Sequence, residues 1–163
     1  LRYMDRYVTI TQGEVFYMTE SLAQLEGLER GPAGNTSLAA AFSIAQEMDK
    51  NQIIVVQETE YTGAGKHIQP QLSFARKNGI DIHFGDPKDE VPGKSIILPE
   101  HPSMIKAVDL DMSKIRRSYV KNMIAKKGGK FGDKDLFTAE ELEYISLESR
   151  LSIEKIKELI LCK

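Results

Sequence analysis

The sequence predicts an α/β fold in which a partial parallel sheet is flanked by helices and followed by a helical C-terminal tail. Three observations lead to this prediction. Capping-box patterns at Thr11–Glu14 and Thr138–Glu141 mark the start of two helices. The uninterrupted β-branched run Ile53–Val56 is bounded by polar residues, as in a strand covered on both faces of a parallel sheet. From Pro99 onward, helices and loops replace the alternation of helices and strands.

The first part of the chain is expected to begin with two helices. One should run from the first capping box to Gly27, a residue that accepts the left-handed conformation at a helix end. Its apolar residues recur at helical spacing on one face: Val15, Met18, Leu22 and Leu25. A second helix is expected over residues 35–48. Its buried side should carry Leu38, Ala41, Phe42 and Ala45.

The elements after Ile53–Val56 are shorter. A helix over 69–77 should end at Asn78–Gly79, and a strand over 80–84 should be less completely buried than the first strand. The composition of residues 86–93 is that of a loop, and a further short strand is expected over 95–98.

The tail is expected to contain a helix over 113–127, a glycine-rich break and two further helices. Ser152 should cap the last helix, whose isoleucines 153, 156 and 160 form one apolar stripe. We therefore expect residues 1–98 to be an α/β part and residues 99–163 a helical extension packed on it.

Composition limits the classes of protein to which the chain can belong. A length of 163 residues with 41% hydrophobic residues suits roughly one domain with a real core. The net charge of −2 gives no basic field that would attract nucleic acid or an anionic membrane. The longest strongly apolar stretch, 38–45, is far shorter than the roughly 20 residues that span a bilayer.

The ends of the chain add two expectations. The single cysteine, Cys162, excludes an internal disulfide and fits a reducing cytoplasm. The chain begins with Leu1 and continues at once with strand-like residues, so we expect it to be a piece of a longer protein.

Two glycine-containing segments are candidate ligand sites. The segment Gly31–Ser37 opens the second expected helix, where small residues let an anion approach exposed N–H groups; an ordinary helix cap is the alternative. The segment Tyr61–His67 follows the carboxyl end of the expected strand Ile53–Val56, where open α/β sheets hold their ligands; a plain strand-to-helix turn is the alternative.

Taken together, the two segments resemble fold-type II pyridoxal-phosphate enzymes, the superfamily of tryptophan synthase β and threonine synthase. The segment Glu26–Ala41 looks like the stretch that enters a helix near the cofactor, and Ile54–Gly65 is similar to the strand that ends in Thr-Gly-x-Gly. The match covers Val8 to Phe84 and only the C-terminal half of the family's catalytic chain.

The resemblance implies pyridoxal 5'-phosphate as cofactor. Thr62 would place its hydroxyl against the pyridine nitrogen, and Gly63, Gly34 and Asn35 would form the wall of the cofactor site. A neutral hydroxyl, unlike a carboxylate, does not force this nitrogen to stay protonated, which weakens the electron sink and favours chemistry at the β position.

Within the superfamily, the runs Arg30–Ser37 and Glu60–His67 are similar to a thiolase-type subunit of amino-acid degradation. This likeness implies cleavage of an amino-acid substrate with coenzyme A to give acetyl-CoA and alanine, in the breakdown of ornithine. It also implies a small α subunit as partner, and family members are commonly homo-oligomers. A threonine synthase-like lyase or synthase fragment is the alternative within this superfamily.

The sequence departs from the family pattern at two points. The Schiff-base lysine and the main phosphate-binding glycine loop lie in the earlier half of the family's chain, and nothing here matches either. We therefore expect no catalytic lysine in this chain and no activity from it alone. Threonine synthases show a Lys-Asp pair where this chain has Lys66–His67.

The remaining polar residues give weaker signals. His67, His83 and His101 lack the spacing of a metal site, and no metal is expected. His67 follows the cofactor turn and could face the substrate carboxylate or the coenzyme A thiol, although a solvated histidine is the simpler interpretation. The basic cluster over 114–130 could contact coenzyme A phosphates or be a solvated helix face. A non-catalytic α/β interaction module, with structural glycine turns, is the competing class of function.

Overall fold

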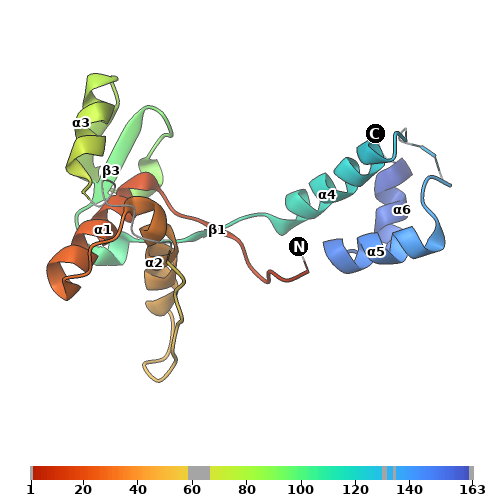
Figure 1. The fold of residues 1–163 in the computed structure, drawn as a ribbon, viewed down its shortest axis with the longest axis horizontal. Helices are drawn as coiled ribbons and strands as arrows, with labels where there is room; N and C mark the ends of the chain where they lie inside the picture. Colours follow the sequence, from red (N-terminus) through yellow and green to blue (C-terminus); the bar gives the residue numbers. More distant parts are fainter. Residues whose placement is uncertain (1, 59–66, 130–131, 134, 162–163) are drawn as a thin grey trace. The chain divides into compact units, whose positions relative to one another are not determined.

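The structure is a computed structural model that describes residues 2–58, 67–129, 132–133 and 135–161. The chain divides into two compact units, which we call the α/β unit (residues 8–108) and the helical unit (residues 1–7 and 109–163) (Figure 1). The division falls at residue 108 and not at residue 98. Residues 99–108 join the α/β unit because Ile105 is fully buried in its core, in a cluster with Val15, Met18 and Ala39.

The α/β unit contains three α-helices, two short 3₁₀ turns and four strands in its described residues. In chain order they are β1 (Val8–Thr9), α1 (Gln12–Glu26), α2 (Pro32–Ala45), α3 (Gln69–Lys77), β2 (Asp81–Gly85), η2 (Pro87–Asp89), β3 (Ser95–Pro99), η3 (Pro102–Met104) and β4 (Val108–Asp109), whose last residue already belongs to the helical unit.

The sheet at the centre of this unit is parallel, as the sequence predicts. Strands β2 and β3 pair in parallel from Asp81 opposite Ser95 to Gly85 opposite Pro99, and β1 pairs separately with β4. Strand β3 is the buried strand of the pair, and α1 packs against it. A core cluster of five buried residues joins Phe16 of α1 and Ile96 of β3 to α3 and its N-cap, which contribute Ile68, Leu72 and Ala75.

Helix α1 begins and ends where local sequence signals place it. The capping box is present, since the Glu14 N–H donates to Thr11 Oγ1 and the Thr11 N–H donates to the Glu14 carboxylate. Gly27 adopts the left-handed conformation with φ of 67° and closes the helix. Of the predicted apolar face, Val15 and Met18 are buried, whereas Leu25 is 80% exposed.

The start of α1 is held against β3 by a residue that the sequence analysis did not identify. The Glu90 carboxylate accepts hydrogen bonds from the backbone N–H groups of Gln12 (2.8 Å), Gly13 (2.9 Å) and Ile97 (2.9 Å). A carboxylate at this end of a helix also complements the helix dipole. The close contact requires glycine, because a Cβ atom on Gly13 would lie 1.8 Å from the carbonyl oxygen of Ile97.

Helix α2 covers residues 32–45 and not 35–48. It starts earlier because Pro32, whose fixed φ suits the first turn and which has no N–H to leave unpaired, stands at its beginning. Ala39 is its fully buried apolar residue, and the predicted burial of Ala45 is wrong.

The predicted strand Ile53–Val56 is also wrong. The segment has no regular secondary structure, and Ile53 and Val55 are 87% and 91% exposed. A strand of a parallel sheet needs a paired neighbour and layers on both faces. The described residues supply neither for this run, since their only parallel pair is β2 with β3.

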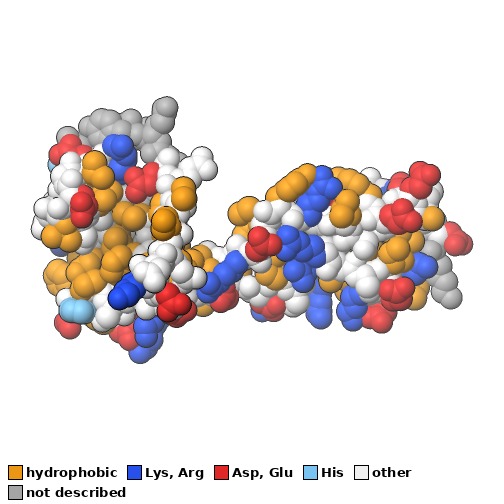
Figure 2. All heavy atoms as spheres, turned by 90° about the horizontal axis from the view of Figure 1, so that it is seen from below, with side chains coloured by type: hydrophobic (Ala, Val, Ile, Leu, Met, Phe, Trp, Pro, Cys, Tyr) orange, Lys and Arg blue, Asp and Glu red, His pale blue; other side chains and the backbone are white. Residues whose placement is uncertain are grey.

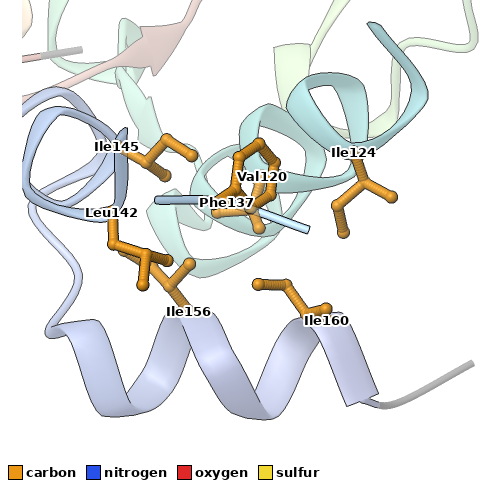
Figure 3. Close-up of a cluster of buried hydrophobic side chains, with 7 residues drawn as sticks. All are labelled: Val120, Ile124, Phe137, Leu142, Ile145, Ile156 and Ile160. Atoms are coloured by element: carbon orange, nitrogen blue, oxygen red, sulfur yellow. The ribbon is translucent and has the colours of Figure 1, made fainter. Parts of the chain in front are cut away.

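The helical unit agrees closely with expectation. Its helices are α4 (Met112–Lys126), α5 (Ala139–Ser149) and α6 (Ile153–Leu161), and Thr138 and Glu141 form the second capping box. The Lys155 N–H donates to Ser152 Oγ at 3.2 Å, as expected of a cap. Figure 3 shows the core side chains, which point toward one another from the three helices and from Phe137: Val120, Ile124, Phe137, Leu142, Ile145, Ile156 and Ile160.

The contact of α1 with β3 can be tested by Gly13→Ala. A Cβ atom would collide with the Ile97 carbonyl oxygen and force α1 away from β3, so the free energy of unfolding should fall by at least about 2 kcal/mol, measured by urea denaturation. The matched control is Gly85→Ala, where the nearest atom to a Cβ is Ile97 Cγ2 at an ordinary 3.4 Å. Equal losses in the two variants would contradict the contact.

Candidate functional site

The first candidate site is the N-terminal end of α2, where the sequence analysis places Gly34 and Asn35. Gly31 is the N-cap and has no side chain to bond the first N–H groups, and Pro32 has no N–H. The backbone N–H groups of Ala33 and Gly34 have no acceptor within the helix, because the first four N–H groups of any helix lack one. The positive end of the helix dipole adds to them, so this position favours an anion.

Asn35 is completely enclosed by protein, and its amide joins two helices. Its Nδ2 donates to Thr19 Oγ1 of α1 at 3.1 Å and to the Arg30 carbonyl oxygen at 3.4 Å. Thr19 Oγ1 in turn donates to the Val15 carbonyl oxygen. Asn35 Oδ1, by contrast, is a buried acceptor without a hydrogen-bond partner in the described structure. The residue therefore fixes α2 against α1 and leaves one acceptor open.

The segment that leads to Thr62 and Gly63 lies beside α2. After α2 the chain turns and runs back along the helix (Figure 1), and Ser37 Oγ donates to the Gln57 carbonyl oxygen at 2.8 Å. Arg30 Nε lies 3.7 Å from a carboxylate oxygen of Glu58. Thr62 and Gly63 themselves lie outside the described residues, so their roles stay predictions. Residues 57–58, which precede the second candidate segment, nevertheless lie against the start of α2 and the residue before it, Arg30.

His67 lies at the far end of the second segment. Its side chain is exposed, while the next residue, Ile68, is the N-cap of α3 and is buried in the core cluster with Phe16 and Ile96. Exposure agrees with the interpretation as a solvated histidine and also leaves the ring accessible to a ligand. Its proposed contact with the substrate carboxylate or the coenzyme A thiol stays a prediction.

These residues fit part of a pyridoxal phosphate site. The N–H groups of Ala33 and Gly34 suit a phosphate or carboxylate, and the enclosed Asn35 holds this end of α2 in place. The glycine at position 34 lets a ligand come close to the backbone.

A second, polar site was not found from the sequence. A pocket of about 430 Å³ lies between the start of α1 and the segment 103–108. It is lined by Thr11, Glu14, Asp86, Lys88, Ser103, Met104, Lys106 and Val108. No motif joins these residues, since they come from parts of the chain that are far apart in sequence.

Most charged side chains of this pocket make hydrogen bonds or ion pairs within the protein. Glu14 is buried, and its carboxylate accepts hydrogen bonds from Thr11 N, Thr11 Oγ1 and Lys106 N at 2.6 to 2.8 Å. Lys88 Nζ lies 2.6 Å from Asp86. This hydrogen bond holds the pKa of the Asp86 carboxyl below its usual value and raises the pKa of Lys88. The pocket is therefore built mainly by structural ion pairs and hydrogen bonds.

The basic cluster lies on α4 and is mostly solvated. Lys114, Arg117, Lys121 and Lys126 are exposed, as a solvated helix face predicts. Lys127 instead pairs with Glu141 and lies 5.8 Å from the centre of the Phe137 ring. A contact of this cluster with coenzyme A phosphates stays a prediction.

The described residues contain neither a metal-binding cluster nor a helix that could cross a membrane. They contain no group of three or more His, Cys, Asp or Glu side chains placed to hold a metal ion. None of the helices formed by these residues has the length and apolar character needed to cross a membrane.

Comparison with known proteins finds two relatives, both named as subunits of a thiolase. The chain is 66% identical over 159 residues to a protein of Acetoanaerobium sticklandii named 2-amino-4-ketopentanoate thiolase beta subunit. It is 49% identical over 160 residues to a protein of the same name from an unknown prokaryotic organism. These alignments cover 96% and 98% of this chain but 34% and 33% of the relatives, so the chain spans about a third of their length.

The names of the relatives agree with the resemblance found in the sequence. The sequence resembles the β subunit of 2-amino-4-oxopentanoate thiolase, and oxo and keto are two names for the same carbonyl group. No protein-family profile and no solved structure matches the chain. Membership of the fold-type II superfamily therefore stays a prediction.

The structural role of Asn35 can be tested by Asn35→Ala. The variant loses the hydrogen bond to Thr19 and leaves a small void, so the free energy of unfolding should fall by about 1–3 kcal/mol in urea denaturation. The control is the neighbouring exposed residue, as Thr36→Ala, which should cost less than about 0.5 kcal/mol. Similar values for both variants would show that the amide does not join α1 to α2.

Proposed function

We propose that this chain is part of the β subunit of a pyridoxal-phosphate-dependent thiolase that cleaves 2-amino-4-ketopentanoate with coenzyme A. The products are acetyl-CoA and alanine, and the reaction belongs to ornithine degradation in the cytoplasm. The observation that carries the proposal is the 66% identity, over 96% of the chain, to a protein named for this activity. The start of α2 supports it, because its uncapped N–H groups form a position that favours an anion.

The reaction balances without an external oxidant or reductant. The bond between C3 and C4 of the substrate breaks, and the coenzyme A sulfur forms a bond to C4, which leaves as the acetyl carbonyl. C3 takes up a proton and becomes the methyl group of alanine. When bound, pyridoxal phosphate supplies an electron sink for the amino-acid fragment.

In this proposal, the residues of this chain bind and orient the cofactor and the substrate. The N–H groups of Ala33 and Gly34 hold an anionic group of the cofactor or the substrate at the start of α2. Asn35 forms part of the wall behind this position, where its Nδ2 keeps α2 fixed on α1. Thr62 offers a neutral hydroxyl to the pyridine nitrogen and so does not hold a proton on it as a carboxylate would. Gly63 leaves room for the ring.

The rest of the activity requires residues and partners beyond this chain. The Schiff-base lysine and the main phosphate-binding loop are expected in the other two thirds of a subunit as long as the relatives. The chain alone is therefore inactive. The name "beta subunit" of the relatives supports a small α subunit as partner, and we further propose that the subunit forms homo-oligomers.

The decisive experiment is reduction with borohydride after addition of pyridoxal phosphate, performed on the complete subunit and on this chain in parallel. We expect one stoichiometric adduct in the complete subunit, on a lysine outside this chain, and none in this chain. With the α subunit present, acetyl-CoA should form from 2-amino-4-ketopentanoate only when coenzyme A is added. An adduct without any coenzyme A reaction would favour a threonine synthase-like enzyme. No adduct in either protein would favour the interaction module.

The role of Thr62 can be tested in the complete subunit by Thr62→Val, with Thr62→Ser as the matched control. Loss of a hydrogen bond to the cofactor costs about 0.5–1.5 kcal/mol, so Thr62→Val should weaken pyridoxal phosphate binding by roughly 2- to 12-fold in an absorbance titration. Thr62→Ser keeps the hydroxyl and should bind as the original protein does. Unchanged binding in Thr62→Val would remove Thr62 from the site.

A further inference from the structure

Arg30 and Glu58 form an ion pair next to the candidate cofactor site. Arg30 Nε lies 3.7 Å from Glu58 Oε2. Arg30 immediately precedes Gly31, the N-cap of α2, and Glu58 stands four residues before Thr62 in the sequence. The pair therefore joins the start of the first candidate segment to the part of the chain that leads into the second.

The Arg30 end of the pair has a fixed backbone. The Arg30 carbonyl oxygen accepts a hydrogen bond from Asn35 Nδ2 at 3.4 Å, and the same amide nitrogen donates to Thr19 of α1. The Arg30 guanidinium also donates through Nη1 to the carbonyl oxygen of Glu29 at 3.1 Å. The guanidinium is thus carried by a backbone that is bonded to α2 and, through Asn35, to α1.

The Glu58 end of the pair is largely covered. The exposed fraction of the Glu58 side chain is 22%, against 40% for Arg30. The neighbouring Gln57 is held independently, because its carbonyl oxygen accepts the hydrogen bond from Ser37 Oγ at 2.8 Å. A carboxylate that is mostly shielded from water is unfavourable without an opposite charge. In the described part of the chain, Arg30 supplies this charge.

We propose that Arg30 and Glu58 are a positioning pair that holds the chain before Thr62 against the start of α2, and so determines how tightly the complete subunit binds pyridoxal phosphate. The proposal rests on the proposed function, which assigns the cofactor to the two candidate segments. The hydrogen bond from Ser37 is one point of attachment, and the ion pair at the next residue adds a second. Two adjacent attachments fix the direction in which the chain continues toward Thr62.

The pair should affect cofactor binding more than folding. A partly exposed ion pair contributes little to the stability of a protein, because water screens it and two long side chains must be ordered. A displacement of the segment by about 1 Å, however, would move every group that reaches the cofactor from it. Loss of the pair should therefore weaken cofactor binding and leave the folded state intact.

The test is a double-mutant cycle in the complete subunit, read as the dissociation constant of pyridoxal phosphate in an absorbance titration. The variants are Arg30→Met, Glu58→Gln and the two combined. We expect each single variant to weaken binding by at least about 3-fold, and the double variant to bind no more weakly than the weaker single one, because the two side chains act as one unit. Arg30→Lys keeps the charge and should retain most of the affinity.

The matched control is Lys155→Met, which removes the exposed ion pair of Lys155 with Glu158 on α6. Charged side chains of both signs are distributed over the visible faces of both units (Figure 2), so loss of one charge should by itself have little effect on binding. This variant should bind pyridoxal phosphate as the original subunit does. Without cofactor, Tm of every variant should lie within about 2 °C of the original value.

Four results would overturn the proposal. Unchanged or tighter binding in Glu58→Gln would mean that Arg30 acts on the ligand itself. Losses that add in the double variant would assign independent roles to the two side chains. Equal losses in Arg30→Met and Lys155→Met would reduce the effect to one of net charge. A larger fall of Tm in both single variants would make the pair a general contribution to folding. If Arg30→Met does not fold, Glu58→Gln, which keeps the size of the side chain, decides.

Failure of this inference and failure of the proposed function give different results. An original subunit that binds no pyridoxal phosphate and forms no acetyl-CoA would reject the function. If the original subunit does both, and Arg30→Met and Glu58→Gln bind the cofactor as tightly, the function stands and the pair has no positioning role.

Discussion

The α/β unit depends on the hydrogen bonds around the start of α1. The Glu14 carboxylate accepts hydrogen bonds from the backbone N–H groups of Thr11 and Lys106. The Glu90 carboxylate accepts hydrogen bonds from the backbone N–H groups of Gln12, Gly13 and Ile97. Charged acceptors make strong hydrogen bonds, and those of Glu14 are shielded from water by its burial. The glycine at position 13 lets the backbones of α1 and β3 approach closely enough for this arrangement.

The position of the candidate cofactor site depends on the position of α1. Helix α1 carries Thr19, Thr19 accepts the hydrogen bond from Asn35, and Asn35 fixes the N-terminal end of α2. The segment leading to residues 59–66 is bonded to α2 in turn, through Ser37 and Gln57. The position of the start of α2 therefore depends on Thr19, in the middle of α1.

The likeness to a third of a longer subunit accounts for features that a self-contained domain would not show. The unit has a two-stranded parallel sheet, an exposed β-branched run and several exposed large side chains: Leu25, Leu28, Phe74 and Phe84. Each is unfavourable in water by itself, and each is explained if further layers of the subunit cover it. The helical unit has one core, enclosed by its three helices and Phe137.

The sequence by itself determined what short-range chemistry decides. Neighbouring residues predicted both capping boxes, the span of α3, the strands β2 and β3, and the isoleucine stripe of α6. The resemblance to thiolase subunits also came from the sequence alone. Three features were decided only by the tertiary structure. Glu90 accepts hydrogen bonds from N–H groups 77 and 78 residues away. Residues 99–108 belong to the α/β unit, and Asn35 is hydrogen-bonded to Thr19. The run Ile53–Val56 shows why: its local pattern favours a strand, but a strand forms only where distant residues supply the hydrogen bonds and the cover.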